Sequence, residues 1–134
     1  MELNFKTEIR ASKIDGKGLF ALTPIPARKK LGNLPGEIIS VRKGRQLAKT
    51  QQRIALVELD DHYALNATDH ESNLKYINHS CMPNTYMRVI NHTVEFYALK
   101  NIARNQELTC NYGETHHDGK LTCQCGAPNC KGFL

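Results

Sequence analysis

Two stretches of this 134-residue chain hold the side chains that could do chemistry, and both contain cysteine. The first, residues 76–84, reads Tyr-Ile-Asn-His-Ser-Cys-Met-Pro-Asn and places two polar side chains that bond in several directions just before a thiol. Its last two residues, Pro83 and Asn84, predict a turn. The second, residues 123–130, reads Cys-Gln-Cys-Gly-Ala-Pro-Asn-Cys and adds three thiols. Four thiolates complete the tetrahedral shell of a structural zinc ion. The spacing therefore predicts one zinc site built from Cys81, Cys123, Cys125 and Cys130.

The cysteines leave two alternatives to zinc open. Thiolate-only ligation also suits an iron–sulfur cluster, and a set of reduced, exposed thiols needs no metal at all. His116 and His117 are alternative ligands, although a polar linker is the role we expect for them. A shell of four thiolates leaves no open position, so the predicted metal is structural and not catalytic.

The composition describes a single globular domain in a reducing compartment. The chain is 40% hydrophobic, has no apolar run long enough to cross a membrane, and begins with a mixed-charge segment that lacks a signal-peptide core. An odd count of five cysteines fits thiols better than a disulfide framework. We therefore expect an intracellular protein with no membrane contact.

The net charge of +5 is a weak indication of an acidic or nucleic-acid partner. The basic residues gather between positions 42 and 53, where a solvated helix face explains them. No aromatic platform or helix-turn-helix accompanies them, so nucleic acid is expected only as an indirect partner.

Short strands must position the two reactive stretches. We predict strands at residues 7–12, 18–22, 38–41, 54–59, 63–67, 86–90, 94–99 and 107–112, and one helix at residues 43–52. Hairpins are expected around the tight turn at residues 15–18, around Asp60-Asp61-His62 and at Asn91-His92. The pattern predicts a mostly β fold.

Five motifs, taken in chain order, resemble the SET-domain protein-lysine methyltransferases that carry a post-SET zinc-binding tail. They are Gly-Lys-Gly-Leu-Phe-Ala (16–21), Pro-Gly-Glu-Ile-Ile (35–39), the 76–84 stretch, Glu-Leu-Thr-Cys-Asn-Tyr-Gly (107–113) and the cysteine-containing segment 123–132. The resemblance implies small β-sheets with a C-terminal pseudoknot. It implies a SET domain at residues 1–113 and a post-SET linker and zinc-binding tail at residues 114–134, as one compact unit.

The resemblance also implies a cofactor and a reaction. S-adenosylmethionine is expected to contact the backbone of Lys17, Gly18 and Leu19, with Asn78 and His79 holding its adenine and amino-acid ends. Tyr112 matches the catalytic tyrosine. The implied reaction is in-line methyl transfer to a deprotonated lysine amine on a histone tail or another basic protein. Such a protein is nuclear in a eukaryote and cytoplasmic in a bacterium or archaeon.

Three positions depart from the family pattern. Leu34 stands where a tyrosine is usual, so a second active-site hydroxyl is either missing or supplied by another tyrosine, such as Tyr86 or Tyr63. Asn111 replaces a common aspartate. Cys110 replaces a bulky aromatic residue that limits the number of methyl groups added, and the smaller side chain leads us to hypothesise di- or trimethylation. We therefore take Cys110, Tyr86, Tyr63 and Leu34 as candidates for the lysine channel.

Two rival functions follow from these departures and from the charge. A SET-like domain with weak or no activity could act as a peptide-binding module, and a zinc-stabilised domain could bind nucleic acid. The segment between Gly36 and Tyr76 is short for this family, so a homodimer that completes the substrate groove is a further hypothesis.

Overall fold

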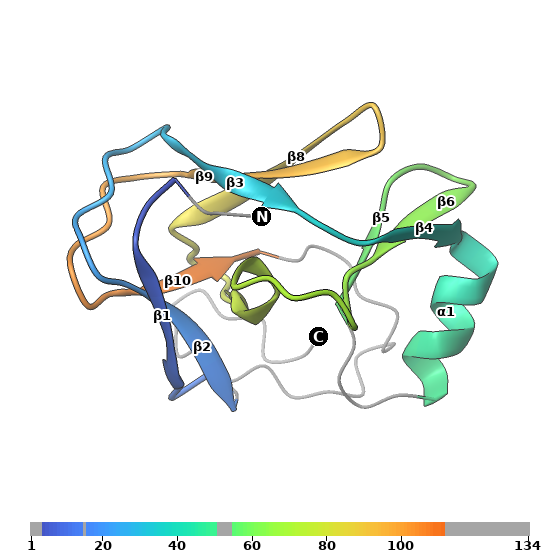
Figure 1. Ribbon diagram of the computed structural model, residues 1–134, viewed down its shortest axis with the longest axis horizontal. Coiled ribbons are helices and arrows are strands. Elements are labelled where there is room, and N and C mark those ends of the chain that lie inside the picture. Colours follow the sequence, from blue (N-terminus) through green and yellow to red (C-terminus); the bar gives the residue numbers. More distant parts are fainter. Residues whose placement is uncertain (1–3, 15, 51–54, 112–134) are drawn as a thin grey trace.

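The computed structural model describes residues 4–14, 16–50 and 55–111 and arranges their strands in two sheets (Figure 1). The larger sheet has the order β1-β2-β10-β8-β9-β3, with β7 beside β10, and the smaller has the order β4-β6-β5. Their bounds are β1 Thr7–Ala11, β2 Lys17–Ala21, β3 Lys30–Leu34, β4 Glu37–Ser40, β5 Leu56–Glu58, β6 Tyr63–Asn66, β7 Asn78–His79, β8 Thr85–Ile90, β9 Thr93–Ala98 and β10 Glu107–Cys110. Helix α1 is Val41–Thr50, and a 3-10 turn, η1, is Leu74–Tyr76. The described part of the chain is mostly β, as predicted.

The three predicted hairpins are confirmed. β1 pairs with β2, β5 with β6, and β8 with β9, all antiparallel. Asn91 and His92 turn the last hairpin with φ angles of 50° and 60°. Two successive left-handed residues match the right-handed twist of the flanking strands, and asparagine tolerates that conformation well.

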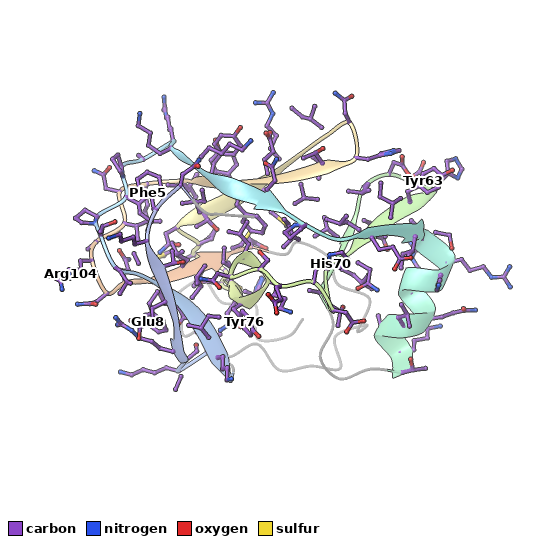
Figure 2. The ribbon with its side chains drawn as sticks, viewed as in Figure 1. Phe5, Glu8, Tyr63, His70, Tyr76 and Arg104 are labelled. Atoms are coloured by element: carbon purple, nitrogen blue, oxygen red, sulfur yellow. The ribbon has the colours of Figure 1, made fainter. Side chains whose placement is uncertain are left out.

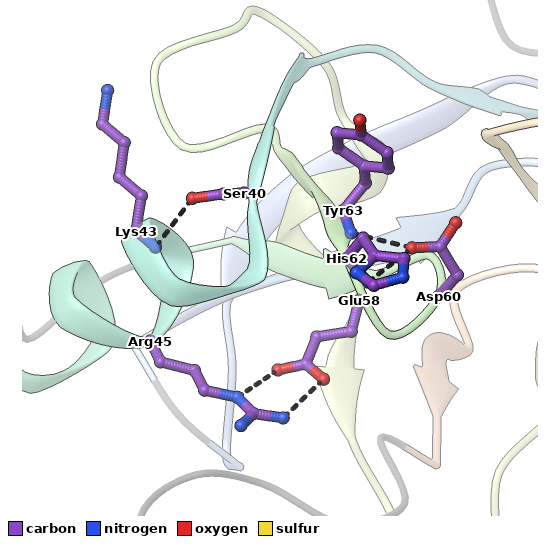
Figure 3. Close-up of polar contacts among 7 residues, drawn as sticks. All are labelled: Ser40, Lys43, Arg45, Glu58, Asp60, His62 and Tyr63. Carbon is purple, nitrogen blue, oxygen red and sulfur yellow. Dashed lines mark hydrogen bonds and ion pairs between the residues drawn. The ribbon is translucent and has the colours of Figure 1, made fainter.

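The predicted helix is confirmed, but it begins two residues earlier than residue 43. The Ser40 hydroxyl accepts a hydrogen bond from the backbone N–H of Lys43 at 3.1 Å, which is an N-cap (Figure 3). The predicted strand 38–41 therefore ends at Ser40, and Val41 is already helical. Residues 51–54 lie outside the described part of the chain, as does the predicted end of this helix.

Two strands were not predicted. β3 contains Gly32 and Asn33, which are weak strand formers, and it exists because it pairs with β9 along the sheet edge. β7 has only two residues and forms by parallel pairing with β10. Neither strand has a local pattern that sequence analysis could detect.

Helix α1 is held against the smaller sheet. Arg45 donates to both carboxylate oxygens of Glu58 on β5, at 3.1 and 3.2 Å (Figure 3). Val41 packs with Ile39 and Ala64 in a small hydrophobic cluster. With its ten residues α1 is too short to cross a bilayer, and no other described helix could do so.

The main core joins distant parts of the chain. Its fully buried side chains come from strands, the 3-10 turn and loops that are far apart in the sequence, among them Leu19, Leu31, Leu74, Ile102 and Leu108. β10 lies at the centre of this arrangement, antiparallel to β2 and parallel to β7 and β8 (Figure 1). The residues after Asn111, including the rest of the expected pseudoknot and the expected division at residues 113–114, lie outside the described part of the chain.

Candidate functional site

The stretch from Asn78 to Thr85 is bonded directly onto β10. The Asn84 side chain accepts from the Thr109 N–H and donates to the Glu107 carbonyl, both at 2.8 Å. The Thr85 hydroxyl donates to the Thr109 carbonyl at 2.7 Å. Since Asn84, Thr85 and Thr109 are all buried, these bonds are made away from competing water.

The turn inside this stretch is stabilised locally. The Ser80 hydroxyl accepts from the backbone N–H of Met82 at 3.0 Å, and the Ser80 N–H donates to the Cys110 carbonyl at 3.0 Å. Pro83 sets the backbone for the return to β8. These bonds hold the predicted turn beside the end of β10.

Asn78 connects the 76–84 stretch to the β1–β2 hairpin. Its amide nitrogen lies 3.1 Å from the Lys17 carbonyl oxygen and 3.0 Å from Oε2 of Glu107. Asn78 and Lys17 are 61 residues apart in sequence, and the sequence analysis assigned both to one cofactor. The structure brings these two residues together.

Gly18 has a packing requirement of its own. A Cβ atom at this position would collide with the Glu107 carboxylate and would approach the Ser12 side chain to 3.1 Å. Leu19 is fully buried in the core, so its side chain is not accessible to a ligand. The two glycines of the motif differ, because Gly16 has φ 45° and supports the turn itself.

His79 and Cys81 lie close to each other. The His79 side chain is buried, Cys81 is half buried, and Sγ of Cys81 is 3.5 Å from Nε2 of His79. Residues 4–14, 16–50 and 55–111 contain no group of three or more potential metal ligands. Cys123, Cys125 and Cys130 lie outside those ranges, so the zinc site stays a prediction.

The lysine-channel candidates have different surroundings. Cys110 is 1% exposed, and burial raises the pKa of its thiol to about 11, with the Thr85 side chain and the Met87 backbone opposing this only in part. Leu34 is buried in the main core and brings no hydroxyl. Tyr86 stacks on Tyr97, with ring centroids 5.3 Å apart.

Tyr63 lies far from the β1–β2 hairpin. Its ring is 46% exposed and contacts His92, with centroids 5.5 Å apart. Figure 2 shows Tyr63 near the end of the molecule opposite Glu8 of β1. Tyr112, the expected catalytic residue, lies outside the described part of the chain.

Sequence analysis assigned no role to Ser12, Glu107 or Thr109, which complete the site. Glu107 and Thr109 stand in the 107–113 motif, but a strand pattern does not say which neighbour each side chain meets. Asn84 was noted only as part of a turn. The one signal in the sequence was the presence of polar residues at positions 107 and 109 of a strand that the fold places at its centre.

The comparisons with known proteins agree with this geometry. Residues 16–113 match the family model of the SET domain. The chain is 36% identical over 135 residues to an Eremothecium gossypii protein named histone-lysine N-methyltransferase, H3 lysine-4 specific, covering 92% of this chain and 14% of that protein. It is 37% identical over 127 residues to histone-lysine N-methyltransferase ATXR7 of Arabidopsis thaliana, covering 88% of this chain and 9% of that protein. The chain is 32% identical over 134 residues to the Caenorhabditis elegans histone-lysine N-methyltransferase set-2, covering 92% of this chain and 9% of that protein. The chain thus spans a small fraction of these relatives.

Proposed function

Because the chain belongs to the SET-domain family, we propose that it is an S-adenosylmethionine-dependent protein-lysine N-methyltransferase. The single observation that supports this best is the contact between the Asn78 amide and the Lys17 carbonyl. It joins two motifs that are distant in sequence and that the family resemblance assigns to one cofactor. The names of the relatives support a histone tail, or another basic protein, as the substrate.

The polar groups at this site suit a positively charged cofactor. The Lys17 carbonyl and the Glu107 carboxylate are acceptors that lie within 3.1 Å of the Asn78 amide nitrogen. S-adenosylmethionine carries a sulfonium and an ammonium group, and both are stabilised by acceptors of this kind. We assign the backbone of Lys17, Gly18 and Leu19, with Asn78 and His79, to its binding.

The cofactor supplies the methyl group, and the protein aligns it with a neutral lysine amine. In-line displacement requires that the two reacting atoms be held in contact and that water be excluded. Desolvation and a nearby cation lower the pKa of the substrate amine, which favours its nucleophilic form. Tyr112 would place a hydroxyl next to the reacting centre. This chemistry requires neither a catalytic metal nor a pair of carboxylates.

We assign a structural zinc ion to Cys81, Cys123, Cys125 and Cys130. Cys81 supports this because its half-buried thiol lies on the turn that Asn84 bonds to β10. Metal analysis should find one zinc per chain, and Cys81→Ser should reduce that content. Full retention of zinc in Cys81→Ser would remove Cys81 from the ligand set.

We expect di- or trimethylated product. Cys110 offers less bulk than the aromatic residue usual at this position and no hydroxyl that could hold water beside the amine. Mass spectrometry of the product at saturating cofactor measures the number of methyl groups. A product that stays monomethylated would contradict the expectation.

The cellular setting follows from the substrate. A histone substrate would place the protein in the nucleus of a eukaryote, and a basic bacterial or archaeal protein would place it in the cytoplasm. Nucleic acid would be reached only through the protein substrate. Dimerisation to complete the substrate groove is testable by sedimentation, and a monomer in the presence of substrate would exclude it.

The test of the function is transfer of labelled methyl groups to a mixture of histones and other basic proteins. Wild type is compared with Tyr112→Phe, and Tyr97→Phe is the matched control because its hydroxyl bonds only weakly to Glu95, at 3.3 Å. We expect label on lysine that falls sharply in Tyr112→Phe alone. Cofactor binding without transfer to any substrate would favour the peptide-binding module. Absence of cofactor binding would overturn the proposal.

A further inference from the structure

The cluster of Ser12, Asn78 and Glu107 carries an inference that rests on the proposed function. We infer that Glu107 and Ser12 are positioning residues that fix the amide of Asn78, so that this amide receives the ammonium group at the amino-acid end of the cofactor. These three residues come from the segment after β1, from β7 and from β10. The fold brings them within hydrogen-bond distance of one another.

The chemistry of the three side chains gives the direction of the bonds in the cluster. The Glu107 carboxylate only accepts, so the Ser12 hydroxyl donates to it, with 2.9 Å from Oγ to each carboxylate oxygen. The Ser12 oxygen then accepts from the Asn78 amide nitrogen at 3.1 Å and from the Ile14 N–H at 3.0 Å. The Asn78 nitrogen also faces Glu107 at 3.0 Å, which closes a triangle of bonds.

This arrangement excludes the flipped amide. With the flip, the Asn78 oxygen would face the Glu107 carboxylate at 3.0 Å and the Lys17 carbonyl at 3.1 Å, and both of these are acceptors. The Asn78 amide nitrogen therefore faces the Glu107 carboxylate, and the amide oxygen points away from that carboxylate. An oxygen in a fixed orientation is suited to accept from a ligand ammonium without a cost of reordering.

Charge supports the same assignment. Among the described residues, no ion pair joins Glu107 to a basic side chain, whereas Glu8, Glu58 and Glu95 each have one. Glu107 is half buried, and Gly18 leaves room for its carboxylate. A negative charge close to Asn78 attracts the ammonium group of a ligand's amino-acid end and has little effect on a neutral purine.

The experiment measures the binding of two ligands by calorimetry. S-adenosylhomocysteine carries the amino-acid end, and 5′-methylthioadenosine lacks it. For Glu107→Gln we expect about tenfold weaker binding of S-adenosylhomocysteine, which corresponds to about 1.4 kcal/mol, and unchanged binding of 5′-methylthioadenosine. Ser12→Ala should show a smaller loss in the same direction. Glu95→Gln is the matched control. It removes a carboxylate that pairs with Lys30, and both residues lie on β9 and β3, at the opposite end of the larger sheet from β1 and β2.

A double-mutant cycle with Asn78→Ala tests whether Glu107 acts through Asn78. Positioning predicts that Glu107→Gln adds little to the loss already caused by Asn78→Ala. Additive losses would mean that Glu107 contacts the ligand directly, and equal weakening of both ligands would mean a merely structural role. Either result would overturn the inference.

A readout in the free protein separates this inference from the proposed function. Glu107→Gln should shift the NMR signals of the Asn78 side-chain NH2 group in the absence of any ligand, while Glu95→Gln should not. Unshifted signals would overturn the positioning role even if the cofactor binds. Shifted signals in a protein whose wild type does not bind S-adenosylhomocysteine would confirm the hydrogen-bond network and reject the proposed function.

Discussion

At the scale of the residue, Gly18 shows how a small side chain can serve a neighbour. The sequence analysis related this glycine to close approach by a cofactor, and the structure adds the Glu107 carboxylate, which lies where a Cβ atom would stand. The packing requirement is visible among the described residues, and the contact with a cofactor stays a prediction.

We predict that Gly18→Ala lowers the free energy of unfolding by about 1–3 kcal/mol, because Glu107 must move. Chemical denaturation of wild type and Gly18→Ala measures this difference in the free energy of unfolding. Gly44→Ala in α1 is the matched control, since its new Cβ would meet other atoms only at 3.6 Å or beyond and alanine favours a helix. In a Glu107→Ala background the cost of Gly18→Ala should shrink, and an undiminished cost would place the collision elsewhere.

Cys110 and Cys81 differ in reactivity for a physical reason. Burial raises the pKa of Cys110 to about 11, from an ordinary value of 9.0, whereas Cys81 is half buried. At pH 8 a thiol with the raised pKa is only about 0.1% thiolate. After treatment with a zinc chelator, iodoacetamide should modify Cys81 well before Cys110, as followed by peptide mass spectrometry. Equal rates would contradict the burial of Cys110.

At the scale of the element, the return from β7 to β8 depends on Asn84. Its amide replaces backbone pairing on both sides, accepting from Thr109 and donating to the Glu107 carbonyl. The turn residues predicted a change of direction here, but they did not predict the strand on which the turn would rest. That partner is distant in sequence.

Asn84→Ala should lower the free energy of unfolding by about 2–4 kcal/mol, because the N–H of buried Thr109 and the carbonyl of half-buried Glu107 both lose the Asn84 side chain as a partner. Asn33→Ala is a matched control that deletes the same atoms from β3. The Asn33 side-chain oxygen is buried and has no hydrogen-bond partner among the described residues, so its loss should cost much less. Similar costs for the two variants, measured by urea denaturation, would refute the role of Asn84.

The β5–β6 turn should make stability depend on acid pH. The backbone N–H groups of His62 and Tyr63 hold the pKa of the Asp60 carboxyl below its ordinary value of 3.8 (Figure 3). A depressed pKa means that the stabilisation is complete above the unfolded-state value and is lost as pH falls through the folded-state value. Asp60→Asn should therefore melt below wild type at pH 7, with the gap closing below pH 3.8. Asp61→Asn is the control, and a gap that persists in acid would contradict the prediction.

At the scale of the whole molecule, β10 makes the two ends of the described chain depend on each other. It pairs with β2 near the start of the chain and with β7 and β8 in the middle. Contacts between such distant segments form only when most of the chain is in place, because closing the intervening loops costs entropy. The sheet should therefore unfold as one unit.

Leu108→Ala tests this cooperativity. Leu108 is fully buried and pairs with Leu19 of β2, so its truncation should cost about 2–5 kcal/mol. Circular dichroism and tyrosine fluorescence should report the same lowered midpoint, with one transition for each. Separate transitions would show that the β1–β2 hairpin unfolds independently of the rest.

The sequence by itself determined the β-rich class, the three hairpins and the single helix, because these depend on alternation, turn residues and propensity within a few positions. It also predicted Lys17, Gly18, Asn78 and His79 as cofactor-binding residues, through motifs whose order resembles a known family, and that assignment stays a prediction. Tertiary structure alone decided that β3 and β7 are strands, since each exists only through a distant partner. It likewise decided that Ser12 and Glu107 meet Asn78, because a strand pattern gives the face of a side chain but not its neighbour.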